Sequence, residues 1–342
     1  MSTSSFGEAL RRVAVGELLS ADEAAGAFDA IMRGEVSEPR MAAFLTALAM
    51  RPPSVAEITG AVRAMRAAMT TVRAPEGTID VCGTGGDGLA TLNVSTATAF
   101  VVAGCGVPVA KHGNRSISSR AGTADVLEQL GVSTNLDADQ AEACLAETGF
   151  CFLFAPKFHP AMRHIAAVRR ELGFRTIFNL IGPLSNPAGV RRQLIGVFSK
   201  DWMGPVAEVL RELGTETAWI VHSDDGMDEI SLSASTQAVV LREGNISRRT
   251  ITPAEVTLRA RPLSATKGGD AKYNSDMLLL LLEGEGLGAY RDIVLLNVAA
   301  ALVIAEKAHH LQGGVELAAS AVESGRALAV LNNVVAFSKS AS

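Results

Sequence analysis

The sequence has few aromatic residues and no excess of basic charge. Aromatic side chains make up only 5% of the 342 residues, and 31 Lys and Arg are set against 36 Asp and Glu, which gives a formal charge of −5. A chain without a basic excess has no general attraction for nucleic acid or for an anionic membrane. We therefore expect neither as a partner, although local cations can still bind a small anion.

Cysteines and long apolar runs are scarce as well. The four cysteines are Cys82, Cys105, Cys144 and Cys151, and none of them forms a C-x-x-C pair. Their apolar surroundings argue against a disulfide framework and indicate buried, reduced thiols. The most apolar run, residues 293–305, is too short to span a bilayer, which takes roughly 20 residues. The first residues lack the apolar segment of a secretory signal, so we expect a cytoplasmic protein.

Two periodic patterns are present instead. Residues 8–71 repeat apolar side chains at spacings of three and four, which predicts several short helices. The rest alternates short β-branched runs with helical stretches, as in an α/β fold with a mainly parallel sheet. We predict a small helical N-terminal domain over residues 1–73, joined by a helical segment near residues 157–180, and a larger α/β domain over residues 76–342. The expected strands are 78–83, 107–110, 151–154, 193–198, 218–221 and 238–241.

A glycine-rich stretch, "VCGTGGDGLATLNVST", contains the end of the first predicted strand. Gly83, Gly85 and Gly88 match the G-x-G-x-x-G pattern of dinucleotide-binding loops, but no Asp or Glu follows between residues 89 and 124 to hold a ribose hydroxyl. A P-loop is excluded because no Gly-Lys-Ser/Thr follows the glycines. Backbone amides and the positive end of the helix expected near Ser95 still favour a phosphate ligand.

A second polar stretch, "KHGNRSISSRAGT", follows the next predicted strand. It contains Lys111, Asn114, Arg115 and three serines, so it adds cations and hydroxyl groups near the glycine-rich stretch. Two such loops at successive strand ends would form a site for a ligand with more than one phosphate. The alternative is that both are ordinary strand-to-helix turns.

Carboxylates are concentrated after another predicted strand, in "VHSDDGMDEISL". Asp224, Asp225, Asp228 and Glu229 offer hard oxygen ligands, which suit Mg²⁺ better than zinc. If this loop meets the glycine loop, the two can share a Mg²⁺-diphosphate, and Asp87 would accept a hydrogen bond from a ribose hydroxyl or from metal-bound water. The alternative is a solvated acidic turn.

Four motifs in this order resemble the anthranilate phosphoribosyltransferase family: "GTGGDG…TLNVST", "KHGNR", "FHPAMRHIAAVRRELGFRTIFNLIGPLSNP" and "DGMDE". The resemblance continues through residues 268–305 and covers nearly all of the chain. It implies transfer of the phosphoribosyl group of 5-phosphoribosyl 1-diphosphate to the amine of anthranilate in tryptophan biosynthesis, with Mg²⁺ and release of diphosphate. It also implies a fold like that of pyrimidine nucleoside phosphorylases, and a homodimer.

The resemblance further implies the residues of the site. The magnesium ligands would be Ser95, Asp228 and Glu229. Anthranilate would contact Gly83, Asn114 and Arg169. The residues expected to take part in catalysis are Asp87, Lys111, Asp228 and Glu229. The donor would contact both polar loops, through Gly83, Gly86, Asp87, Thr91, Asn93, Val94, Ser95, Thr96, Lys111, His112, Gly113, Asn114, Arg115, Ser116, Ile117, Ser118, Ser119 and Thr123.

Arg169 and His159 both lie in the third motif. A guanidinium binds a carboxylate through two hydrogen bonds, so Arg169 suits the ortho carboxylate of anthranilate. His159 is open to three interpretations: a catalytic base, a contact to the substrate at a helix start, or a structural cap. An aromatic amine is already a neutral nucleophile at pH 7 and needs no base before attack.

Other functions share some of these features. A pyrimidine nucleoside phosphorylase shares the implied fold, and related phosphoribosyltransferases use other acceptors; the long third motif favours anthranilate. A non-catalytic relative that binds nucleic acid would be expected to lose the acidic pair and gain basic residues. This chain keeps Asp228 and Glu229 and is net acidic, which favours the enzyme.

Overall fold

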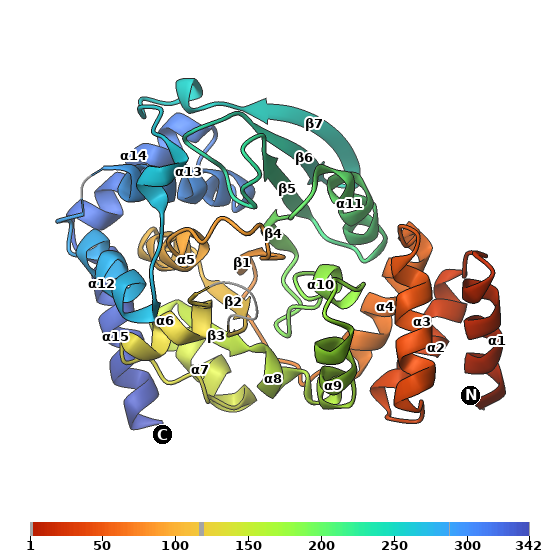
Figure 1. The fold of residues 1–342 in the computed structure, drawn as a ribbon. Helices are drawn as coiled ribbons and strands as arrows, with labels where there is room; N and C mark the ends of the chain where they lie inside the picture. The colour runs from red at the N-terminus through yellow and green to blue at the C-terminus, as the bar shows by residue number, and fades with distance from the viewer. Residues whose placement is uncertain (1–2, 116–119, 287, 342) are drawn as a thin grey trace.

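The computed structural model describes residues 3–115, 120–286 and 288–341, which fold around a seven-stranded sheet (Figure 1). The strands are β1 (Ile79–Gly83), β2 (Val109–Gly113), β3 (Phe150–Phe154), β4 (Arg192–Gly196), β5 (Thr217–Ser223), β6 (Thr236–Arg242) and β7 (Asn245–Ile251). Their order in the sheet is β3-β2-β1-β4-β5-β6-β7. Neighbouring strands pair in parallel from β3 through β2, β1 and β4 to β5. The strands β6 and β7 continue the sheet in antiparallel pairing.

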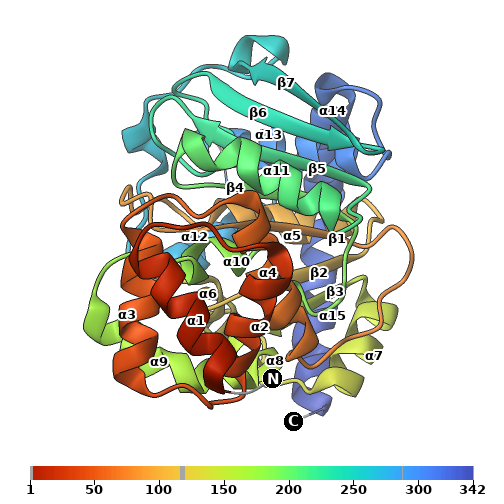
Figure 2. The same ribbon diagram turned by 90° about the vertical axis from the view of Figure 1, so that its right-hand side faces the viewer.

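Helices cover both faces of the sheet. On one face, α5 (Val94–Gly104) and α13 (Ala289–Ile304) contact the central strands, and α14 (Leu311–Glu323) and α15 (Arg326–Ser340) pack against them. On the other face, α11 (Met203–Glu212) contacts β5 and β6 (Figure 2). The other helices of this part are α6 (Thr123–Gln129), α7 (Ala138–Thr148), α8 (Ala155–Phe158) and α12 (Ala271–Leu282).

Four N-terminal helices form the right-hand side of Figure 1, and two helices from the middle of the chain join them. They are α1 (Thr3–Ala14), α2 (Ala21–Met32), α3 (Glu38–Ala49), α4 (Val55–Ala67), α9 (Arg163–Leu172) and α10 (Phe178–Ile181). The Phe178 ring packs edge-on against Phe28 with ring centroids 5.7 Å apart, and Ile165 and Val168 lie in the same apolar cluster. This cluster continues to Val206 of α11, so the helical part packs against the helix that covers one face of the sheet.

The predicted fold class is confirmed: a small helical part lies beside an α/β part with a mainly parallel sheet. Each predicted strand overlaps an observed one, although β2 begins later than expected, at Val109. The strand β7 was not predicted. Its sequence, "NISRRTI", is mostly polar and exposed because β7 is an edge strand, where charged side chains are common and the alternation of apolar residues is weak.

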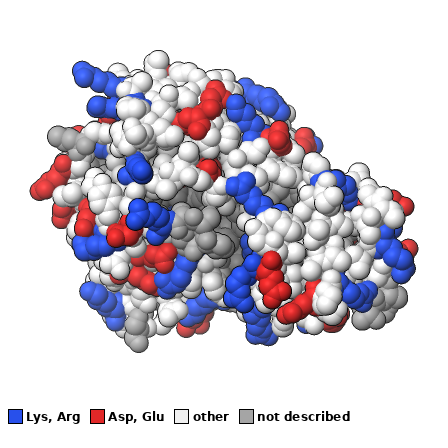
Figure 3. Space-filling model, in the orientation of Figure 1, with Lys and Arg blue, Asp and Glu red and all other residues white. Residues whose placement is uncertain are grey.

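Three further observations concern membrane-spanning helices, surface charge and the cysteines. No helix among the described residues combines the length and the apolar character that crossing a membrane requires. Basic and acidic side chains are mixed over the face drawn in Figure 3. All four cysteines are buried as free thiols.

A buried ion pair connects the helices of the N-terminal part. Glu57 has no exposed surface, and its carboxylate accepts hydrogen bonds from the Arg51 guanidinium at 2.6 and 2.8 Å. It also accepts from the amides of Leu19 and Ser54, at 3.1 and 2.8 Å. Burial raises the pKa of Glu57, but these four bonds outweigh it and leave the pKa below its ordinary value. The pair therefore ties the start of α4 to the segment before α2.

We expect Glu57→Gln to destabilise the protein by roughly 3 kcal/mol, because an amide cannot accept all four bonds and leaves Arg51 unpaired. Glu23→Gln is the matched control, since Glu23 closes the equivalent capping box of α2 on an exposed surface. Its loss should stay below about 1 kcal/mol. Chemical denaturation measures both, and equal losses would show that capping alone accounts for the effect.

Candidate active site

The glycine-rich and acidic stretches lie at one edge of the sheet. The parallel strands β1, β2 and β4 end there at Gly83, Gly113 and Gly196, so the loops that follow these strands and β5 lie close together. Ligands of open α/β folds bind at this edge. We call residues 84–93, between β1 and α5, the glycine loop, and residues 224–235, between β5 and β6, the acidic loop.

The glycine loop turns through left-handed backbone conformations. Gly85, Gly86 and Gly88 have φ values of +64°, +79° and +79°, which glycine adopts without steric cost. Ala90 has a φ of +51°, which is uncommon for a residue with a side chain. Asp87 stabilises the turn, because its Oδ1 accepts a hydrogen bond from the amide two residues later at 3.0 Å. The carboxylate in this loop thus has a structural role within the loop itself.

The glycine loop is bonded to the acidic loop through Asp228. The Gly85 amide donates to Asp228 Oδ2 at 2.9 Å. Gly196 of β4, the strand between them, permits this approach, since a Cβ atom there would lie 1.5 Å from the Asp228 carbonyl oxygen. The carboxylate of Glu229 interacts with the Ser95 amide at the start of α5. Both acids therefore face the loop between β1 and α5.

The carboxyl groups of this site destabilise one another's charge. Burial raises the pKa of Asp228, and Asp87 raises it further, while the Gly85 amide opposes the change. Burial also raises the pKa of Glu229, with Asp228 adding to the effect and Lys111 opposing it. A cation bound among these groups would stabilise their ionised forms.

The donor atoms fit magnesium. Among residues 3–115, 120–286 and 288–341, no group of three or more His, Cys, Asp or Glu side chains is arranged to hold a metal ion. Magnesium commonly takes only one or two carboxylates and completes its shell with phosphate oxygens and water. Asp228, Glu229 and the Ser95 hydroxyl carry oxygen atoms of this kind next to the glycine loop.

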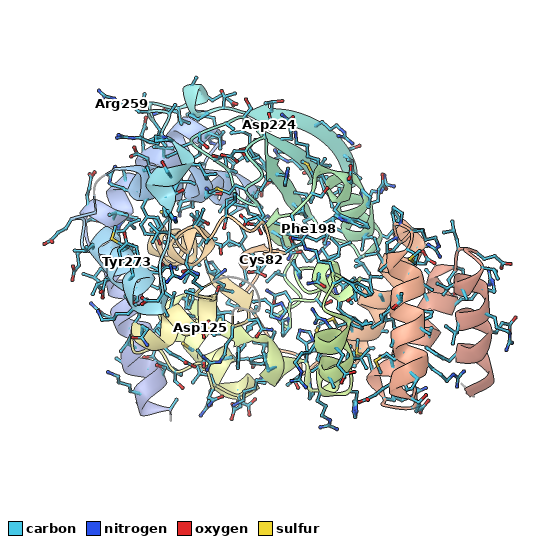
Figure 4. All side chains as sticks on the ribbon, in the orientation of Figure 1. Cys82, Asp125, Phe198, Asp224, Arg259 and Tyr273 are labelled. Carbon is cyan, nitrogen blue, oxygen red and sulfur yellow. The ribbon has the colours of Figure 1, made fainter. Side chains whose placement is uncertain are left out.

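The other two acids of the acidic loop are engaged elsewhere. Asp224 is exposed and pairs with Lys200 at 2.6 Å. Figure 4 shows it near the upper edge of the molecule, away from Cys82 at the end of β1. Asp225 accepts a hydrogen bond from Ser231 Oγ at 2.6 Å and so closes its own loop. The four acids that lie together in the sequence are thus divided between two environments.

The segment that begins at Lys111 meets the glycine loop. Lys111 is buried, and its Nζ donates to the Val81 carbonyl at 2.7 Å and to Ser95 Oγ at 3.2 Å. The hydroxyl groups of Thr96 and Thr123 lie 3.3 Å apart. The first turns of α5 and α6 are therefore neighbours.

Two predicted donor contacts in this segment bind protein groups in the structure. The Arg115 guanidinium pairs with Asp125 at 3.0 Å and Glu128 at 2.5 Å on α6. Asn114 Oδ1 accepts a hydrogen bond from the Arg115 amide at 2.8 Å. The remaining predicted contacts in this segment lie outside the described residues: Ser116, Ile117, Ser118 and Ser119.

His159 contacts the predicted donor residue His112. Both are buried, and their Nε2 atoms are 3.2 Å apart. Burial lowers the pKa of His112 to about 3 and that of His159 to about 4. Both rings are therefore neutral at pH 7, with one Nε2 donating its proton to the other.

Arg169 is a largely buried cation on α9. Burial lowers the pKa of Arg169, and no acid among the described residues offsets this effect. Its guanidinium lies 5.7 Å from the centroid of the Phe178 ring. An unpaired guanidinium beside an aromatic ring suits a flat ligand that carries a carboxylate.

Sequence reasoning missed three residues that support the glycine loop. Arg175 donates to the Gly86 carbonyl. Asn274 donates to the Asn93 side chain at 2.8 Å, and the Tyr290 hydroxyl donates to the Asn93 carbonyl at 3.2 Å. Their only signal in the sequence was that they fall within the stretches that carry the family resemblance.

Two family descriptions match most of the chain. Residues 76–328 match "Glycosyl transferase family, a/b domain", and residues 7–69 match "Glycosyl transferase family, helical bundle domain". The fold and the site at the sheet edge thus define a glycosyl transferase with these two parts.

Similar proteins narrow this class. The anthranilate phosphoribosyltransferase of Rhodopseudomonas palustris (strain HaA2) is 52% identical over 336 residues, which are 98% of this chain and 99% of the relative. The crystal structure of anthranilate phosphoribosyltransferase from Thermus thermophilus has a TM-score of 0.92 and 44% identity, covering 97% of this chain and 99% of that one. The Saccharomyces cerevisiae enzyme in complex with PRPP and Mg has a TM-score of 0.90 and 26% identity, covering 99% of both chains. The chain belongs to the anthranilate phosphoribosyltransferase family.

We expect the buried histidine pair to lower the stability of the protein in acid. A histidine in the unfolded chain has a pKa of about 6.5, whereas His159 stays neutral down to about pH 4 and His112 down to about pH 3. Between these values the unfolded chain binds more protons, so the free energy of unfolding falls as the pH falls. The contribution is complete above about pH 6.5 and decreases by up to about 1.4 kcal/mol per pH unit for each histidine below it.

Chemical denaturation between pH 4 and 7 (roughly the range of these shifts) checks this. His159→Gln should reduce the pH slope by about one proton, while His309→Gln, at an exposed position, should leave it unchanged. If His159→Gln and the protein without substitutions show the same dependence of unfolding free energy on pH, the low pKa assigned to His159 is wrong.

Proposed function

We propose that this protein transfers the phosphoribosyl group of 5-phosphoribosyl 1-diphosphate to the amine of anthranilate, releasing diphosphate, as a step of tryptophan biosynthesis. The observation that carries the proposal is the Gly85–Asp228 hydrogen bond, which brings a loop suited to phosphate and a pair of magnesium-type ligands to one place. The Saccharomyces cerevisiae enzyme supports it, because one of its structures is a complex with PRPP and Mg and another is a complex with 4-fluoroanthranilate.

On the donor side, we assign the phosphates to the glycine-loop amides and to the segment 111–123. Ser95, Asp228 and Glu229 would hold Mg²⁺, which supplies positive charge opposite the diphosphate when bound. Lys111 donates a hydrogen bond to Ser95 Oγ and would supply a second positive charge near the diphosphate. Stabilising the charge that develops on the departing diphosphate is the main task in such a displacement.

On the acceptor side, we assign the carboxylate of anthranilate to Arg169, with Asn114 and Gly83 as further contacts. Holding the amine opposite the leaving group then makes the attack effectively intramolecular. We assign His159 a positioning role, because a histidine with a pKa of about 4 is a weak base at neutral pH and the amine needs none before attack.

The assay that tests the function is the loss of anthranilate fluorescence on mixing protein, 5-phosphoribosyl 1-diphosphate and Mg²⁺. We expect the loss to require all three. Asp228→Asn should lower kcat/KM by about 100-fold or more. Asp224→Asn is the matched control in the same loop, because Asp224 pairs with Lys200 on the surface, and it should change kcat/KM less than about twofold. A folded protein that leaves the fluorescence unchanged would reject anthranilate as the acceptor and leave other amines and nucleobases to be tested.

Arg169→Ala should raise the KM for anthranilate by roughly 10- to 100-fold and leave the KM for the donor nearly unchanged, because only the acceptor carries the carboxylate. Arg170→Ala, which removes an exposed arginine from the next position of α9, is the control and should change neither. Steady-state kinetics with each substrate varied in turn measures both effects. Equal increases for donor and acceptor would contradict the assignment of the carboxylate.

We further propose a cytoplasmic homodimer that contacts its partner through the helical part. Val15, Leu18 and Met50 are exposed apolar residues there, and buried free cysteines suit a reducing compartment. Sedimentation equilibrium should give twice the mass of the chain, and a monomer would contradict the dimer.

We also propose a division into two domains, a helical domain (1–73, joined by 157–180) and an α/β domain (76–342). The packing of α9 among the N-terminal helices supports this division.

A further inference from the structure

Asn93 occupies the N-cap of α5 but does not cap the helix. An asparagine at this position normally accepts a hydrogen bond from the second or third amide of the helix. No such side-chain bond is present here. Instead, Asn93 Oδ1 accepts a hydrogen bond from Asn274 Nδ2 at 2.8 Å, at the start of α12. The side chain is therefore held away from the end of the helix that it would otherwise cover.

The orientation of both amide groups is fixed by their other partners. Asn274 Oδ1 accepts a hydrogen bond from the Gly269 amide at 2.7 Å, so only its Nδ2 can face Asn93. Asn93 must then present its oxygen to Asn274 and its nitrogen to the Ala121 carbonyl, which lies 3.3 Å from it. Asn274 is 2% exposed, so the protein shields this arrangement from solvent. Each facing pair is a donor with an acceptor.

The segment 266–269, just before Asn274, holds the glycine loop from the same side. The Gly268 amide donates to the Ala90 carbonyl at 2.8 Å, and the Leu92 amide donates to the Thr266 carbonyl at 2.9 Å. Ala90 has a left-handed conformation that costs energy for a residue with a side chain, and these bonds compensate for that cost. Figure 4 labels Tyr273, which marks the start of α12 beside this segment.

We propose that Asn274 is a positioning residue of the donor site. By holding the Asn93 side chain away from α5, it keeps the Thr96 amide available to a phosphate group of 5-phosphoribosyl 1-diphosphate. The inference rests on the proposed function, in which the start of α5 belongs to the donor site. Free amides and the positive end of a helix bind phosphate, and a capping oxygen from Asn93 would occupy the same position.

Calorimetric titration with 5-phosphoribosyl 1-diphosphate and Mg²⁺, without anthranilate, tests the proposal. Asn274→Ala and Asn274→Asp should each weaken donor binding by about tenfold or more. The Asp variant keeps the acceptor for the Gly269 amide and so preserves the segment 266–269, whereas the Ala variant adds no charge. Ser275→Ala is the matched control. It removes a buried hydroxyl at the next position, which among the described residues bonds to the Lys272 carbonyl of the same helix, and it should leave affinity unchanged.

A double-mutant cycle separates this role from a general loss of structure. Because Asn274 acts through Asn93, the double variant Asn93→Ala/Asn274→Ala should bind the donor no more weakly than Asn93→Ala alone. Losses that multiply in the double variant, or full affinity in both Asn274 variants, would overturn the proposal. The KM for anthranilate should stay unchanged in all variants. If the protein without substitutions fails to bind the donor, both the proposed function and this inference are wrong. If it binds the donor but transfers nothing to anthranilate, only the identity of the acceptor is wrong.

Discussion

The contact between the glycine loop and the acidic loop constrains the rest of the site. The Gly85 amide can reach Asp228 only because β1 and β5 flank the same strand, β4, in parallel and end at the same edge. It also requires Gly196 at the end of β4, where any side chain would collide with the Asp228 backbone. The strand order, the glycine in the middle strand and the polar residues at the strand ends therefore serve one arrangement.

Ionised groups are destabilised at two places in the protein. Burial and mutual repulsion raise the pKa of Asp228 and Glu229, although the Gly85 amide and Lys111 oppose this, and the result favours a bound cation. Arg169 is largely buried without an acid to pair with it among the described residues, which favours a bound carboxylate. Both conditions cost stability in the free protein. The Glu57–Arg51 pair differs, because the Glu57 carboxylate accepts four hydrogen bonds, two of them from Arg51, although Arg51 Nε has no partner among the described residues.

The sheet and the glycine loop could be predicted from the sequence, because they depend on residue type and on the spacing of apolar residues. Alternation of β-branched runs with helices indicated the sheet, and glycines before a helix indicated an anion-binding loop. The edge strand β7 lacks the alternation of apolar and polar residues that marks a strand, since Ile251 at its end is its one buried residue. The split of the acidic loop was not predictable either: Asp224 differs from Asp228 through the partners Lys200 and Gly85, which only the folded chain brings near.

The residues that sequence reasoning missed act at long range, and one of them connects the segment after α9 to the glycine loop. Arg175 follows α9, the helix that carries Arg169, and its guanidinium donates to the Gly86 carbonyl while lying 4.3 Å from the centroid of the Phe198 ring. The segment that follows Arg169 is thus bonded to the glycine loop. Residues 86 and 175 lie far apart in the sequence, so this contact depends on the fold and has no local sequence signal.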